Sequence, residues 1–167
     1  MSLHAVFAPS SASRWMKCPA SVPLTAKMHA SPSVHSVYTA SGTVIHAIGE
    51  QVLRAVFLDK TDHRPLLDHA MKSQWGYYAD LPREFRYEAV DSDMVEQVEV
   101  YLFNARELID EGDVVHVEKR VHFSPQLFGT VDLIVEKPEH LIICDLKTGS
   151  GNMVSSWENH QLLTYAG

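Results

Sequence analysis

The stretch Leu141-Ile-Ile-Cys-Asp-Leu-Lys-Thr-Gly149 decides the fold of this chain. Its first four residues are apolar and predict a buried strand. Asp145 and Lys147 follow two positions apart, and in extended backbone such side chains point to the same face. A carboxylate and an ammonium group therefore leave one strand end together, and Gly149 then ends the strand. Burying a charge is costly unless it is paired or holds a metal, so the pair indicates a functional site.

The composition fits one globular domain in a reducing compartment. The chain has 167 residues, of which 46% are hydrophobic, which is too few for two comfortable domains. Its net charge of −7 argues against a nucleic-acid coat built from a basic surface, although a local basic groove remains compatible with it. Two cysteines, Cys18 and Cys144, cannot form a disulfide scaffold. Because the chain shows neither a secretory signal nor an apolar run of about 18 residues, we expect a cytoplasmic protein with no membrane segment.

Three strands are expected in quick succession, over residues 114–123, 129–136 and 140–147. The first alternates valines with polar residues such as His116 and Glu118, which is typical of a half-buried strand. The turns Ser-Pro-Gln and Lys-Pro-Glu are short. Such turns predict an antiparallel meander.

Two long helices are predicted from apolar residues that recur every three or four positions. One covers residues 91–111, where Asp91 or Ser92 can cap its start. The other covers residues 42–58 and carries His46 beside apolar positions. A histidine on such a face is more often structural than a ligand, so His46 needs further support from other motifs.

Shorter helices are expected near residues 11–18, near residues 65–78 and from Trp157 onward, with a mobile loop over residues 31–41. The chain divides into an N-terminal helical region, residues 1–90, and a core, residues 91–167, which together form a single domain. The expected fold class is α/β, with a helix, a three-stranded meander and a second helix as its core.

Acidic residues and a lysine converge at one end of the expected sheet. Asp132 interrupts the apolar middle strand, and Asp145 and Lys147 end the third. Carboxylate oxygens suit hard cations such as Mg²⁺ or Mn²⁺. Lys147 beside them could orient or deprotonate an attacking water, or hold a phosphate, as metal-assisted phosphodiester hydrolysis requires. Residues 77–87 are rich in arginine and tyrosine and could hold a nucleic-acid strand, although ordinary mixed surfaces have such a composition more often.

Three motifs in order resemble the PD-(D/E)XK nuclease superfamily, and most closely its RecB-like exonuclease branch. They are Gly-Thr-Val-Asp132, then after twelve residues Asp145-Leu-Lys147-Thr-Gly, and then Gln161-Leu-Leu-Thr-Tyr165. The resemblance implies a restriction-endonuclease-like core in which the antiparallel meander belongs to a mixed sheet. It also implies a nuclease whose partner is DNA.

Upstream residues extend the resemblance. The RecB-like branch carries a histidine on an upstream helix, often as Gly-x-x-x-His, which Gly42 and His46 match. It commonly carries a glutamate on the strand before the first aspartate, which Glu118 matches. The stretch Ser-Arg-Trp-Met-Lys-Cys-Pro-Ala-Ser, residues 13–21, further resembles phage- and prophage-encoded members.

The resemblance implies a role for each matched residue. The implied metal ligands are His46, Asp132, Asp145 and the backbone carbonyl of Leu146. Lys147 would act on the attacking water, and Glu118 would be catalytic or would support the ligands from behind. Gln161 and Tyr165 would brace the site or contact the DNA backbone.

The chain departs from the family pattern in two ways. The superfamily core has a further strand after the last helix, and the sequence leaves no residues for it. We therefore expect a fragment, a minimal version, or a sheet completed by a partner chain or a second copy. Several members also hold an iron–sulfur cluster with one N-terminal cysteine and three beyond the final helix. Cys18 matches the first, but the others are absent and Cys144 is expected in the core, so the cluster cannot form within this chain alone.

Three functions are consistent with these motifs. The first is a metal-dependent DNA nuclease, expected to be an exonuclease, in phage recombination, replication or repair within a bacterial or phage-infected cell. The second is a catalytically weak or inactive DNA-binding or assembly module that keeps the nuclease fold. The third is a metal hydrolase that acts on a smaller phosphodiester.

Overall fold

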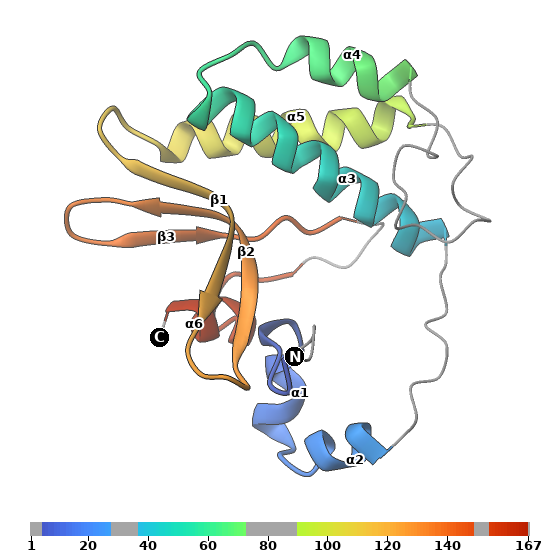
Figure 1. Cartoon of the computed structure of the whole chain (residues 1–167), viewed down its shortest axis with the longest axis vertical. Helices are drawn as coiled ribbons and strands as arrows, with labels where there is room; N and C mark the ends of the chain where they lie inside the picture. The colour runs from blue at the N-terminus through green and yellow to red at the C-terminus, as the bar shows by residue number, and fades with distance from the viewer. Residues whose placement is uncertain (1–4, 28–36, 73–89, 149–153, 167) are drawn as a thin grey trace.

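The computed structural model describes residues 5–27, 37–72, 90–148 and 154–166. Helices α3, α4 and α5 lie above the sheet in Figure 1, and α6 lies below it with the N-terminal helices. In chain order the elements are η1 (Pro9–Ser11), α1 (Ala12–Lys17), α2 (Ser21–Lys27), α3 (Val37–Leu53), η2 (Arg54–Leu58), α4 (Arg64–Lys72), α5 (Ser92–Leu108), β1 (Val114–His122), β2 (Phe128–Glu136), β3 (Leu141–Cys144) and α6 (His160–Ala166).

Helix α5 forms within the range that the apolar periodicity predicts, although it ends at Leu108 rather than at residue 111. Asp91 caps its start, because the Asp91 carboxylate accepts a hydrogen bond of 2.8 Å from the Met94 amide. Its buried side chains are three to four residues apart and face the core. They are Met94, Val98, Leu102 and Ala105.

Helix α3 begins earlier than the sequence suggests. The expected loop over residues 31–41 is wrong from Val37 onward, where α3 starts, and its earlier part lies outside the described residues. Ser, Thr and Gly in this first part have low helix propensity. The helix extends through them because adding a residue to an existing helix costs far less than nucleating one. The last turn, η2, is π-helical.

The three strands form an antiparallel sheet in the order β1-β2-β3, which confirms the expected meander. No parallel strand occurs among the described residues, so the mixed sheet that the resemblance implies has only its antiparallel part here. Strand β3 ends at Cys144 rather than at Lys147 and pairs only with the second half of β2. The first half of β2 pairs with β1 alone and extends past β3, as Figure 1 shows.

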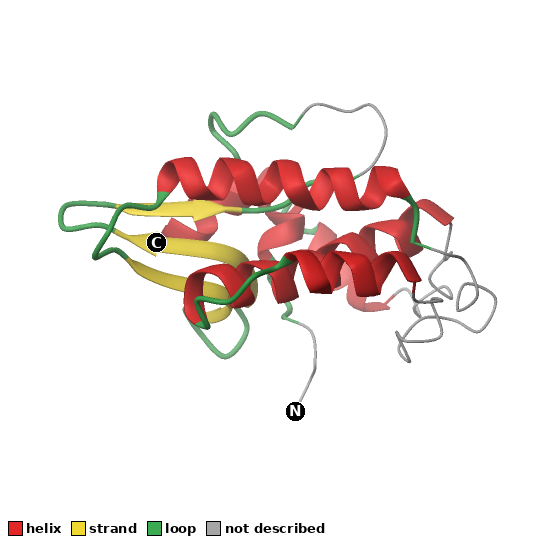
Figure 2. Ribbon diagram, turned by 90° about the horizontal axis from the view of Figure 1, so that it is seen from above, coloured by secondary structure: helices red, strands yellow, loops and turns green. Residues whose placement is uncertain are grey.

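One hydrophobic core joins both regions of the chain. Val117, Leu133 and Cys144 lie opposite one another across the three strands. Together with the apolar faces of α3, α4 and α5 they form a single cluster. Figure 2 shows these helices side by side along the sheet. The N-terminal region therefore packs on the sheet and can bring His46 to it.

Helix α6 and the N-terminal turn cover the extended half of the β1–β2 hairpin. The Tyr165 hydroxyl donates a hydrogen bond of 2.8 Å to the carbonyl of Thr130. A Cβ at Gly129 would lie only 2.6 Å from that hydroxyl and 3.0 Å from Pro9, so the close packing requires glycine. Helix α6 begins at His160 rather than at Trp157, because the Asn159 side chain accepts hydrogen bonds from the first-turn amides.

Two further expectations fall partly outside the described residues. The helix predicted over residues 65–78 is present as α4 up to Lys72, and residues 73–89, with the arginine- and tyrosine-rich stretch, are not described. None of the described helices combines the length and the apolar character that a membrane-spanning helix needs.

Replacing Leu133 by alanine is expected to lower the free energy of unfolding by about 2–5 kcal/mol, because the side chain is 0% exposed. Leu163→Ala is the matched control on α6, where the side chain is 56% exposed. The control should change the free energy by less than about 0.5 kcal/mol. Chemical denaturation followed by circular dichroism measures both, and equal effects would contradict the placement of Leu133 in the core.

Candidate metal centre

Three carboxylates share one row across the sheet. The β1–β2 register pairs Val117 with Leu133 and Lys119 with Val131, so Glu118 lies opposite Asp132. The β2–β3 register pairs Leu133 with Cys144, and its continuation by one residue places Asp145 beside Asp132. Neighbouring strands are about 4.8 Å apart, and like charges at that separation destabilise a sheet. The arrangement therefore needs positive groups or hydrogen-bond donors around it.

The backbone departs from regular strand geometry at this row. Glu118 has a φ of 50°, in the left-handed region that costs a non-glycine residue about 1–2 kcal/mol. No residue is inserted, because the register is the same on both sides of Glu118. Strain of this kind concentrates at functional sites, where the surrounding structure maintains it.

Glu118 and Asp132 form a cluster with His46 of α3. One ligand atom from each of the three side chains lies within 4.8 Å of the other two, and the cluster could hold a metal ion. The donor set of one imidazole and two carboxylates is chemically suited to a divalent cation. The sequence places His46 and Glu118 72 positions apart, and only the packing of α3 on the sheet unites them.

The sequence of α3 brings His46 to the cluster. Gly42, one turn before His46, approaches the segment after β3 so closely that a Cβ would lie 2.8 Å from the Thr148 hydroxyl. At the other end of the helix, the Arg54 guanidinium donates to the carbonyl of Val117, next to Glu118, over 3.2 Å. Contacts at both ends thus hold α3 against the strands that carry the carboxylates.

Asp132 connects the helix to the segment after β3. Its Oδ1 lies 3.6 Å from His46 Nδ1, and its Oδ2 accepts a hydrogen bond of 2.6 Å from the Leu146 amide. Leu146, whose carbonyl the resemblance assigns to the metal, thus contacts the centre through its N–H. The Leu146 side chain packs against the hydrophobic core.

Asp145 lies outside this cluster and is held by two other residues. Lys147 forms an ion pair with Asp145, so the two side chains share a face as the sequence predicts. Gln161 of α6 donates to Asp145 Oδ1 over 2.5 Å and accepts from Lys147 Nζ over 3.0 Å. Gln161 therefore braces both residues.

Burial and mutual repulsion alter proton binding in the cluster. Burial, together with the Asp132 and Glu50 carboxylates, raises the pKa of Glu118 to about 7. The hydrogen bond to Asp132 raises the pKa of His46 above its usual 6.5, against the opposing effect of burial. The Asp132 carboxylate contributes to both shifts, and a bound cation would neutralise its charge.

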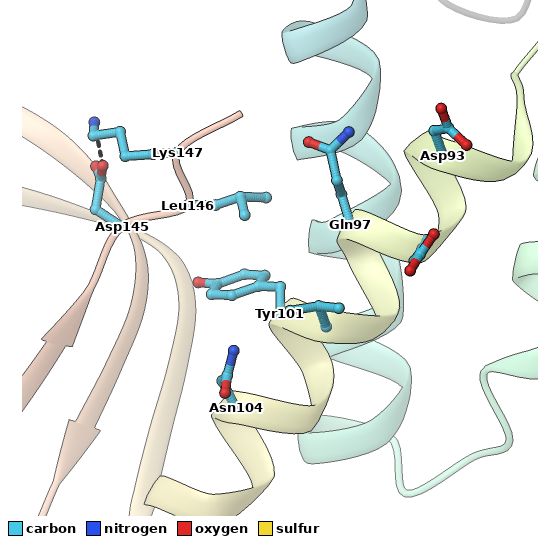
Figure 3. Close-up of a pocket in the computed structure, with 9 residues that line it drawn as sticks. Asp93, Gln97, Tyr101, Asn104, Asp145, Leu146 and Lys147 are labelled. Carbon is cyan, nitrogen blue, oxygen red and sulfur yellow. Dashed lines mark ion pairs between the residues drawn. The ribbon is translucent and has the colours of Figure 1, made fainter. Parts of the chain in front are cut away.

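Tyr101 is a site residue that sequence reasoning missed. Its ring lies between α5 and the Asp145–Lys147 segment, as Figure 3 shows. Its hydroxyl is buried without a hydrogen-bond partner among the described residues, and burial raises its pKa. The ring lines a hollow of about 420 Å³ on the α5 side of the site. In the sequence Tyr101 is one member of an apolar stripe, and nothing there marks its hydroxyl.

The other residues singled out from the sequence lie outside the cluster of His46, Glu118 and Asp132. Tyr165 braces α6 against β2 through Thr130. Cys144 packs against the core and Cys18 is exposed, and both are free cysteines.

Comparison with known protein families identifies the family of this chain. A family model described as "Protein of unknown function (DUF2800)" matches residues 4–167. The chain belongs to the DUF2800 family. The matched span includes both the α3 helix with His46 and the strands with the carboxylates, so the centre of this DUF2800 chain lies wholly inside the family region. No solved structure matches the chain.

Gly42→Ala is expected to weaken Mn²⁺ binding at the centre, because its new methyl group would meet the Thr148 hydroxyl at 2.8 Å. Gly49→Ala, on the same helix, is the matched control, since its Cβ would meet only Leu146 and Tyr101 at ordinary distances of 3.6 and 3.9 Å. The control should stabilise the helix by up to about 1 kcal/mol. Thermal unfolding and Mn²⁺ titration compare them, and metal affinity reduced equally in both variants would contradict the close approach at Gly42.

Glu118→Gln is expected to stabilise the metal-free protein above pH 7. In the folded state Glu118 keeps its proton to about pH 7, while in the unfolded state it loses it near its ordinary pKa of 4.5. The contribution of Glu118 to the free energy of unfolding is thus fully present below pH 4.5 and is lost as the pH rises through about 7. The variant lacks this loss, so its Tm at pH 8 should exceed that of the wild type by a few degrees.

The control for this comparison is Glu99→Gln on the exposed side of α5. Its Tm should follow the wild type from pH 4.5 to 8 in the presence of a chelator. A Glu118→Gln variant with no pH-dependent advantage would show that the carboxylates do not repel one another as described.

Proposed function

We propose that this protein is a metal-dependent DNA nuclease of the PD-(D/E)XK superfamily that acts on DNA ends. The observation that carries the proposal is the cluster of His46, Glu118 and Asp132, with Lys147 on the neighbouring segment. These residues occur in the order and spacing of the RecB-like motifs. The antiparallel sheet with helices on both sides also agrees with a nuclease core.

The donor set favours Mg²⁺ or Mn²⁺ as the metal. Two carboxylates supply hard oxygen ligands, and His46 adds an imidazole nitrogen that Mn²⁺ accepts readily. A cation bound there would polarise a phosphodiester and lower the pKa of a bound water. Asp132 fixes the orientation of the cluster, because its second oxygen is held by the Leu146 amide.

Lys147 is the residue proposed to act on the attacking water. Its ammonium group has three N–H donors. Asp145 and Gln161 take two of them, which fixes the nitrogen at the end of β3 and leaves a third for a water or a phosphate oxygen. Asp145 serves first as the partner that orients Lys147, and its place in the carboxylate row keeps it next to the metal cluster.

A second candidate function is DNA binding or assembly without turnover. The observation that favours it is the position of Asp145, which is engaged by Lys147 and Gln161 and is not part of the three-residue cluster. Binding of DNA that survives Asp132→Asn, without any cleavage by the wild type, would support this candidate. The third candidate function is a hydrolase that acts on smaller phosphodiesters. A competition assay with DNA distinguishes it from the nuclease.

The deciding experiment is incubation of end-labelled linear DNA and closed circular DNA with Mg²⁺ or Mn²⁺, beside Asp132→Asn. We expect degradation of linear DNA only, and its loss in the variant. Equal activity of both proteins would point to a contaminating nuclease and contradict the site. Absence of cleavage by folded, metal-loaded wild-type protein would contradict the nuclease proposal.

Lys147→Ala is expected to lower the cleavage rate by about 10²-fold or more while Mn²⁺ binding is retained. The side chain is 47% exposed and its removal leaves the core intact. Lys72→Ala, an exposed lysine of α4, is the control for the lost charge and should cleave normally. Rates from single-turnover assays and a metal titration measure the two effects. Loss of folding in Lys147→Ala would instead show a structural role.

A further inference from the structure

We propose that a second cavity, between η1, the β1–β2 hairpin and α6, binds a phosphate group of the substrate strand through Arg120. The inference rests on the proposed function, in which this phosphate belongs to DNA. The cavity has a volume of about 300 Å³. It is separate from the hollow beside α5, since the two share no lining residue.

The lining of this cavity suits an anion. Arg120 is the only charged residue among the described residues that line it, and Ser10, Thr130, Gln161 and Tyr165 contribute hydroxyl and amide groups. None of the described carboxylates lines it, although the chain carries a net charge of −7. Hydrogen-bond donors without competing acidic groups are what phosphate recognition requires.

An aromatic ring holds the Arg120 side chain in place. Its guanidinium carbon lies 4.6 Å from the centre of the Phe128 ring, and Phe128 stacks on His122 with ring centres 5.3 Å apart. A cation–π contact orients the guanidinium and leaves its N–H groups available. Among the described residues no acidic side chain forms an ion pair with Arg120. The planar fork of donors can therefore take a phosphate in bidentate fashion.

Gln161 connects the cavity to the segment that carries Asp145 and Lys147. Gln161 lines it and also contacts both Asp145 and Lys147. Arg120 is two residues from Glu118 along β1, which corresponds to about 7 Å in a strand. A phosphate held by Arg120 would thus lie one short step along a strand of DNA from a phosphate at the metal cluster.

The hollow on the α5 side is the less favourable path for the same strand. Its lining includes Asp93 and Glu96, which repel phosphate, and the Asp145–Lys147 ion pair, in which the two charges offset each other. Figure 3 shows Asp93 and Gln97 on the wall opposite the Asp145–Lys147 pair. The charge difference between the two cavities directs the substrate backbone to the side of Arg120.

The test is binding of a fluorescent single-stranded oligonucleotide in a chelator, measured by anisotropy over a range of salt concentrations. Arg120→Ala should weaken binding about tenfold and reduce the salt slope by about 0.7. Lys119→Ala is the matched control, since it removes the same charge from the adjacent exposed position of β1. Arg120→Lys keeps the charge but not the fork, so its affinity should lie between Arg120→Ala and the wild type. Equal effects of Arg120→Ala and Lys119→Ala, or no binding by the wild type, would overturn the inference.

Oligonucleotides with different ends show whether the bound phosphate is a terminal or an internal one. Oligonucleotides with a 5′-phosphate, a 3′-phosphate or neither are compared, with inorganic phosphate as competitor. A loss in Arg120→Ala that is confined to one phosphorylated end assigns a terminal phosphate, and an equal loss with all three assigns an internal one. Wild-type protein that binds but does not cleave, with binding weakened in Arg120→Ala, would contradict the nuclease proposal and leave this inference intact.

Discussion

The repulsion between the carboxylates of Glu118 and Asp132 is the constraint on which the rest of the site depends. Glu118 and Asp132 lie opposite each other on β1 and β2, where like charges lie close together, and Asp145 follows directly after β3. Regular pairing stops at this row, because Glu118 adopts a left-handed conformation and β3 ends just before Asp145. Positive groups and hydrogen-bond donors around the carboxylates offset this repulsion. They are His46, the Leu146 amide, Lys147 and Gln161.

This constraint explains why the helices on both sides of the sheet belong to the site. Helix α3 supplies His46 from one side, and α6 supplies Gln161 from the other. The short C-terminal helix also contacts the N-terminal turn through Tyr165 and Gly129 and so borders the cavity at Arg120. The acidic centre and the phosphate-binding cavity proposed beside it therefore share one set of supporting elements, and a strand of DNA would contact both.

Much of this arrangement could be predicted from the sequence, because it depends on local patterns. The periodicity around Val98 and the short turns between strands predicted α5 and the meander. The ion pair of Asp145 and Lys147 followed from their spacing. The left-handed backbone of Glu118 and the partner of Asp145 could not be predicted, because they depend on packing between distant segments. The sequence left open whether Glu118 is catalytic or supports the ligands from behind, and the tertiary structure places it within the cluster that could hold a metal ion.

The most direct test of the central claim is the anomalous diffraction of crystals soaked in Mn²⁺. The account predicts one strong peak about 2.0–2.3 Å from a ring nitrogen of His46 and from carboxylate oxygens of Glu118 and Asp132. It also predicts that the peak disappears in Asp132→Asn. Absence of a peak at this cluster in the wild type, or a peak only at exposed carboxylates such as those of Asp93 and Glu96, would contradict the account.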